Sequence, residues 1–159
     1  MKKFNDYIHR IRNEPAGGSG LPVVKGRVDI KKADSEKMQA FGWASVSLVE
    51  NGEQIEDWQE DMIDPEDLEE AAYQFVIFYR DGGEMHERGG VATLIESIVF
   101  TEEKQAALGI PAGTLPVGWW IGFQITDPEV WEKVKSGEYP MFSIEGEAER
   151  VEVDPEEDQ

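Results

Sequence analysis

His86 and Ser143 are the two side chains whose types and settings could carry out nucleophilic chemistry. The chain contains two histidines, and His9 lies in a polar segment near the N-terminus. His86, in the run GGEMHERGG, is therefore the one credible proton acceptor near neutral pH. Ser143 lies in the apolar run PMFSIEG, where a glycine allows a backbone or a substrate to approach closely. A serine hydroxyl can attack a carbonyl when an imidazole takes its proton, whereas the ordinary alternatives are a turn histidine and a satisfied strand serine.

Glu96 is a charged residue in an otherwise apolar predicted strand, residues 91–100. Strict alternation of side chains predicts that one face of this strand carries Ala92, Leu94, Glu96, Ile98 and Phe100. The other face would carry Thr93, Ile95, Ser97 and Val99. A carboxylate in an apolar row needs a partner or a raised pKa, because burying a lone charge is costly.

Other kinds of catalytic site have weaker support. Glu84 and Glu87 lie near His86, but neither an HExxH nor a CxxC spacing exists, so no metal is expected. The glycine pairs match no phosphate-binding motif, and no cofactor is expected. Glycoside hydrolysis needs two carboxylates at a defined separation, and a chain with 34 acids does not single out such a pair.

The composition narrows the class of protein. A chain of 159 residues predicts about one domain, and the absence of cysteine excludes disulfides, thiolate metal sites and a cysteine nucleophile. The formal net charge of −19 disfavours direct binding to nucleic acid or to anionic lipid. Neither an apolar run near the ~20 residues of a membrane span nor a secretory signal is present, so we expect a soluble intracellular protein without membrane partners.

The predicted elements favour one α+β domain with a mainly antiparallel, barrel-like sheet. Strands are predicted at residues 23–30, 41–49, 91–100, 119–126 and 139–153. Helices are predicted to begin at Asp64, Thr101 and Asp127, and glycines are predicted to end them. Residues 1–22 are predicted to be a flexible N-terminal arm, residues 23–153 the single domain, and residues 154–159 an acidic tail.

Three long runs within residues 41–150 resemble the XkdF-like prohead proteases of tailed phages. They are FGWASVSLVENGEQIEDWQEDMIDPEDLEEAAYQF, GGEMHERGGVATLIESIVFTEEKQAALGIP and LPVGWWIGFQITDPEVWEKVKSGEYPMFSIEGEAER. The resemblance implies a serine endopeptidase of capsid maturation, related in fold to the herpesvirus assemblins, with a compact β-barrel surrounded by helices. It implies action in the host cytoplasm and the procapsid interior, with phage scaffold and major capsid proteins, and the enzyme itself, as substrates.

The resemblance also assigns site residues. The histidine of the GGEMH motif is His86, and the serine of the MFSI motif is Ser143. Glu96 matches the ESIVFT motif and is the first candidate for the third member of a triad, with Glu145 and Glu147 as alternatives. The assemblin relatives imply a homodimer or a higher oligomer. A second hypothesis is a non-enzymatic capsid-assembly scaffold or chaperone that keeps the fold without the chemistry.

Overall fold

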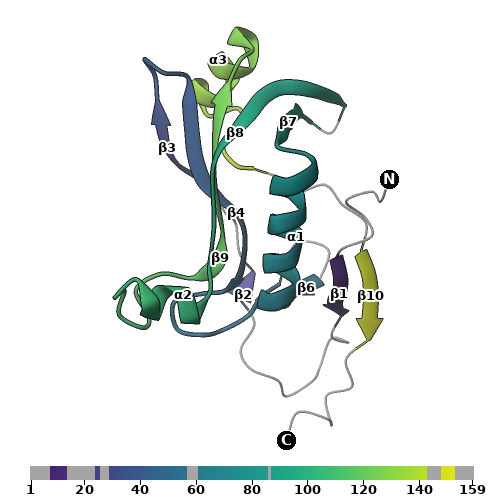
Figure 1. The fold of residues 1–159 in the computed structure, drawn as a ribbon. Helices are drawn as coiled ribbons and strands as arrows, with labels where there is room; N and C mark the ends of the chain where they lie inside the picture. The colour runs from purple at the N-terminus through teal and green to yellow at the C-terminus, as the bar shows by residue number, and fades with distance from the viewer. Residues whose placement is uncertain are drawn as a thin grey trace, which may run out of the picture.

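The computed structural model describes residues 8–13, 24–25, 29–56, 61–85, 87–142 and 148–152. The fold within these ranges is drawn in Figure 1. The strands are β1 (Ile8–Asn13), β2 (Val24–Lys25), β3 (Ile30–Asp34), β4 (Gln39–Leu48), β5 (Ile55–Glu56), β6 (Asp61–Ile63), β7 (Asp81–Glu84), β8 (Arg88–Phe100), β9 (Val117–Ile125) and β10 (Ala148–Glu152). The helices are α1 (Pro65–Phe78), α2 (Glu102–Ala107) and α3 (Pro128–Ser136).

The main sheet has five strands in the order β3-β4-β9-β8-β7, and every neighbouring pair is antiparallel. A smaller sheet has the order β10-β1-β6, and β2 pairs with β5 in parallel. The predicted α+β class with a mainly antiparallel sheet is therefore confirmed. Among the described strands the main sheet is open, with β3 and β7 at its edges, so the barrel-like closure stays a prediction.

The three helices begin where the sequence predicts. The Thr101 side chain accepts a hydrogen bond from the Lys104 amide at 3.2 Å, and the Asp127 carboxylate accepts from the Glu129 amide at 2.8 Å. Gly137 ends α3 with a φ of 77°, which an L side chain adopts only with strain. Asp64 is the N-cap of α1 but makes no side-chain capping hydrogen bond, and Pro65 supplies the preset first turn.

Strand β9 lies at the centre of the main sheet, and both of its faces are covered. On one face, four side chains of β9 pack beneath α1 and α3 in the hydrophobic core: Trp119, Ile121, Phe123 and Ile125. Leu68 and Ala72 of α1 and Val130 and Trp131 of α3 complete this contact. On the other face, the Trp120 ring meets the Trp43 ring edge to face, with centroids 5.4 Å apart.

A β-bulge in β8 overturns the predicted alternation of its side chains. Leu94 pairs with Phe123, but Glu96 pairs with Gly122, so one extra residue stands in β8 at this point. Ala92 therefore faces the core, whereas Ile98 and Phe100 share the opposite face with Glu96. Strict alternation over residues 91–100 is wrong for this reason. The bulge lies in the long, strongly bent strand that curves over to β7 in Figure 1.

Four described strands lie in segments for which the sequence predicts no strand: β1, β5, β6 and β7. Residues 81–83 are predicted to end a helix, but Asp81–Glu84 form β7 and pair with β8. Within the predicted N-terminal arm, β1 lies between β10 and β6. The rest of residues 1–22 and the tail 154–159 lie outside the described residues. No helix in the described ranges is long and apolar enough to cross a membrane.

A substitution at Gly118 tests how closely β9 packs against β4. A Cβ atom at this position would lie 2.7 Å from the Ser45 carbonyl oxygen, which belongs to the backbone and cannot rotate away. We expect Gly118→Ala to lower the free energy of unfolding by about 1–3 kcal/mol, measured by urea denaturation. The control is Gly89→Ala, because the nearest atom to its Cβ is Asp81 Oδ2 at 3.8 Å. Equal effects of the two substitutions would contradict the assigned packing.

Candidate functional site

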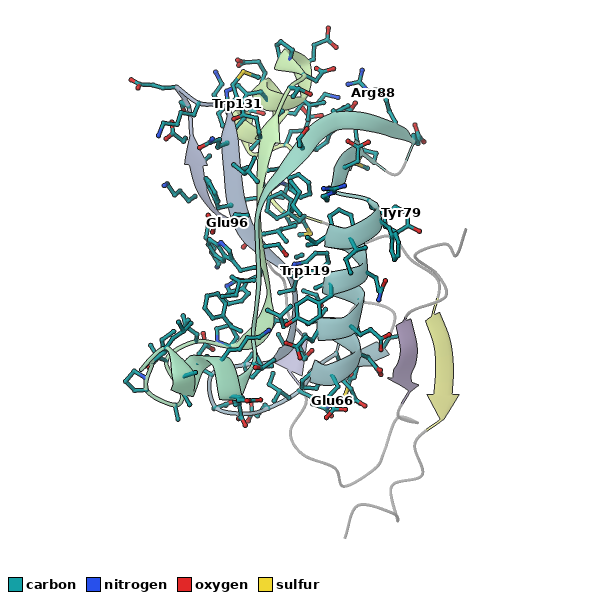
Figure 2. The ribbon with its side chains drawn as sticks, viewed as in Figure 1. Glu66, Tyr79, Arg88, Glu96, Trp119 and Trp131 are labelled. Carbon is teal, nitrogen blue, oxygen red and sulfur yellow. The ribbon has the colours of Figure 1, made fainter. Side chains whose placement is uncertain are left out.

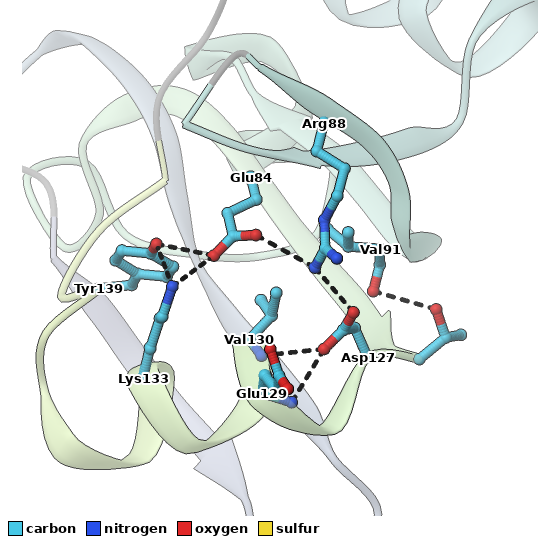
Figure 3. A network of polar contacts seen from close by, with 9 residues as sticks. Glu84, Arg88, Val91, Asp127, Glu129, Val130, Lys133 and Tyr139 are labelled. Carbon is cyan, nitrogen blue, oxygen red and sulfur yellow. Dashed lines mark hydrogen bonds and ion pairs between the residues drawn. The ribbon is translucent and has the colours of Figure 1, made fainter.

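Glu84 joins three elements at one end of the sheet, as Figure 3 shows. It is the last residue of β7 and stands two residues before His86 in the chain. Its Oε1 atom accepts hydrogen bonds from Lys133 Nζ of α3 at 2.7 Å and from the Tyr139 hydroxyl at 2.8 Å. Tyr139 stands four residues before Ser143. The segment that leads to His86 is therefore bonded to the segment that leads to Ser143.

Arg88 is the first residue of β8, which forms an antiparallel hairpin with β7. Its guanidinium lies 3.1 Å from Glu84 Oε2 and 2.7 Å from Asp127 Oδ2. Asp127 is the N-cap of α3, so the first strand residue after the hairpin turn is tied to the start of that helix. We call these five residues the Glu84 cluster: Glu84, Arg88, Asp127, Lys133 and Tyr139.

The electrostatics of the Glu84 cluster favour its charged form. The hydrogen bond from Lys133, followed by that from Tyr139, holds the pKa of Glu84 below its ordinary value of 4.5. The same contact with Glu84 raises the pKa of Lys133. The pKa of Asp127 is lowered chiefly by the backbone amide of Val130. The cluster is therefore a set of charge-assisted hydrogen bonds at neutral pH.

An aromatic contact brings the same two segments together on the core face of the sheet. The Phe142 ring packs on the Phe123 ring of β9, with centroids 5.7 Å apart. Phe123 also lies against Gly82 of β7, where an added Cβ would come within 3.2 Å of the ring. Pro140 in the same segment accepts a hydrogen bond from the Ile30 amide of β3 at 2.7 Å. Residues 139–142 are thus fixed to β3, β7 and β9.

Most of the predicted site residues lie outside the described ranges. They are His86, Ser143, Glu145 and Glu147. The described neighbours of His86 are Met85 and Glu87, and the described neighbour of Ser143 is Phe142. The structure brings together the segments that precede His86 and Ser143.

Glu96 is described, and its setting differs from the expected one. It is exposed and lies on the sheet face away from α1, as Figure 2 shows. Its Oε1 atom accepts a hydrogen bond from Trp120 Nε1 at 2.7 Å. Glu96 therefore shares its face with Ile98 and Phe100 as predicted, and the partner that its carboxylate was expected to need is the Trp120 indole N–H. The bulge moves Ala92 and Leu94 to the other face, and the Glu96 side chain is exposed rather than buried.

The sequence did not reveal the contacts of the Glu84 cluster. Lys133 and Tyr139 lie 49 and 55 residues from Glu84 in the chain, and no local spacing indicates these pairs. The position of Glu84 inside the GGEMH run was the only available signal. Within the described ranges, no group of three or more metal-binding side chains is arranged around a common point.

Comparison with known proteins identifies the class. Residues 27–152 match the model of a phage protein family described as "Putative phage serine protease XkdF", and the chain belongs to this family. It is similar to "Uncharacterized protein YqbD" of Bacillus subtilis (strain 168), with 29% identity over 127 residues. The match covers 79% of this chain and 36% of that relative, so the chain spans about a third of the relative's length. No solved structure matches the chain significantly.

The lowered pKa of Glu84 predicts a specific pH dependence of stability. A carboxylate whose pKa is depressed by folding stabilises the protein fully above its ordinary value of 4.5 and loses this effect as the pH falls through the depressed pKa. We expect Glu84→Gln to lower the free energy of unfolding at neutral pH, and the difference from the parent to shrink below pH 4.5.

Chemical denaturation over a pH series measures this difference. The matched control is Glu70→Gln, which removes an exposed carboxylate from the middle of α1. A difference between the parent and Glu84→Gln that stays constant as the pH falls below 4.5 would contradict the assigned charge network.

Proposed function

We propose that the chain is a phage serine endopeptidase that cleaves scaffold and capsid proteins, and itself, during capsid maturation. Membership of the family supports the protease class. The observation that carries the proposal is the hydrogen bond between Glu84 and Tyr139 at 2.8 Å, since it joins the segments that precede His86 and Ser143. The proposal includes the barrel-like closure of the sheet, the procapsid location and the oligomeric assembly that the resemblance implies.

Covalent geometry makes this contact relevant to the candidate pair. Consecutive Cα atoms are about 3.8 Å apart. His86 follows Glu84 by two residues, and Ser143 follows Phe142 by one. Glu84 is bonded to Tyr139, and Phe142 packs on Phe123, so each candidate follows within two residues a position that is held in place by these contacts. This arrangement of the preceding residues supports the proposal that the imidazole and the hydroxyl work as a pair.

The proposed reaction is acyl transfer. His86 takes the proton of the Ser143 hydroxyl as the oxygen attacks the scissile carbonyl, and backbone N–H groups stabilise the oxyanion. The protonated imidazole then gives its proton to the leaving amine, and water hydrolyses the acyl-enzyme by the same steps. A carboxylate behind the imidazole favours its charged form. Glu96 lies on the sheet face opposite to the one on which Phe142 packs, and its carboxylate is bonded to Trp120. We therefore propose Glu145 or Glu147 for that role.

The second candidate function is a capsid-assembly scaffold or chaperone without catalysis. The formal net charge of −19 favours it, because a strongly acidic protein stays soluble and attracts basic partners. In this case the protein would bind capsid protein and remain intact.

Coexpression with the scaffold and capsid proteins of the same phage separates the two functions. We expect shortened products with the parent chain, and a loss of cleavage by more than about a thousandfold in Ser143→Ala and His86→Ala, because members of a triad act as a unit. Mass spectrometry of the products measures this. Unchanged cleavage in both variants would contradict the assigned pair, and intact proteins bound to the parent chain would favour the scaffold.

The same assay identifies the third member of the triad. We expect Glu96→Gln to cleave at a rate close to that of the parent, and either Glu145→Gln or Glu147→Gln to cleave much more slowly. Trp120→Phe is the matched control, since it removes the hydrogen bond to Glu96 and keeps the carboxylate. Loss of cleavage in Glu96→Gln but not in Trp120→Phe would restore Glu96 as the orienting acid.

A further inference from the structure

We infer that Tyr139, whose hydroxyl donates to Glu84, is a positioning residue that sets the segment leading to His86 against the segment leading to Ser143. This inference rests on the proposed function, because it supposes that His86 and Ser143 act together. Tyr139 and Glu84 are both part-buried, and each belongs to the segment that carries one candidate. The contact therefore acts across the site and not within one element.

The Glu84 carboxylate is suited to fix the hairpin because both of its oxygens are engaged. Oε1 accepts from Lys133 and Tyr139, and Oε2 faces Arg88. The Glu84 side chain is 16% exposed. Hydrogen bonds and an ion pair from three directions leave the carboxylate one orientation, so the end of β7 is held at a point two residues before His86 in the chain.

The Tyr139 hydroxyl is the part of this arrangement that reaches the Ser143 segment. It donates to Glu84 at 2.8 Å and accepts from Lys133 at 3.0 Å, while the Lys133 ammonium also lies 5.1 Å from the tyrosine ring centroid. Removing the hydroxyl leaves the direct contact between Lys133 and Glu84 in place. Tyr139→Phe thus removes the direct hydrogen bond between the Ser143 segment and the hairpin without leaving a buried charge unpaired, while the contacts of Pro140 and Phe142 stay in place.

A second cluster of the same three residue types provides a matched control. Between α1 and α2, the Tyr73 hydroxyl donates to Glu69 at 2.7 Å, and Lys104 donates to Tyr73 at 2.6 Å and also to Glu69. Lys104 lies 5.0 Å from the Tyr73 ring centroid. Tyr73→Phe removes the same hydroxyl from the same kind of contact in a part of the fold that carries no candidate residue.

The test uses the scarcity of histidine. The full chain with His9→Gln has His86 as its single histidine, so the imidazole signals in an NMR spectrum belong to one residue. Ser143→Ala is introduced into three chains that all carry His9→Gln: the parent, Tyr139→Phe and Tyr73→Phe. The measured quantity is the change in the His86 imidazole signals that Ser143→Ala causes in each of them. Thermal unfolding of each variant is recorded beside it. We expect a clear change in the parent and in Tyr73→Phe, and a largely lost change in Tyr139→Phe.

The rate of cleavage provides a second readout. We expect Tyr139→Phe to lower kcat by about 10- to 100-fold with KM little changed, because a small misplacement of reacting groups costs rate more than binding. Equal responses to Ser143→Ala in the parent and in Tyr139→Phe, with equal kcat, would overturn the positioning role alone. No response in the parent would overturn the pairing of His86 with Ser143, and the positioning role with it.

Discussion

The burial of strand β9 on both faces is the constraint on which the rest of the structure depends. Trp119 and Trp120 are neighbours in the chain, so they must point to opposite faces of the sheet, and each face then needs a cover. The helices α1 and α3 cover the first face, and Trp43 of β4 packs on the second. Gly118 lets the β4 backbone approach at a distance that a larger residue would forbid.

The same strand links the core to the candidate site. Phe123 belongs to the buried face of β9, yet its ring also contacts Gly82 on one side and Phe142 on the other. The segments that precede His86 and Ser143 are thus positioned by the hydrophobic core. The hydrogen bond between Glu84 and Tyr139 then fixes how the two segments are oriented relative to each other. Apolar packing sets which segments meet, and charged hydrogen bonds set how they are oriented.

Local signals in the sequence were sufficient for the starts of the helices, but not for the end of α1 or for the edge of the sheet. Thr101 and Asp127 act within one turn of their own positions, so their effect could be predicted. Strand β7 was missed because Gly82 has little strand propensity, and only the close approach of Ala92 and Phe123 explains a glycine there. The bulge after Leu94 has no signature in the residue types of the strand, so strict alternation placed Glu96 on the same face as Ala92 and Leu94. The residue types of His86 and Ser143 could be selected from the sequence, but the long-range partners of Glu84 could not.

Covalent labelling with a fluorophosphonate tests the central claim most directly, because the reagent phosphonylates a serine hydroxyl much faster when an adjacent base has activated it. Mass spectrometry of the digested protein locates the adduct among the seven serines of the chain. The account predicts an adduct on Ser143 in the parent chain and its loss in His86→Ala. An unlabelled parent chain, or an adduct on another serine that forms equally well without His86, would contradict it.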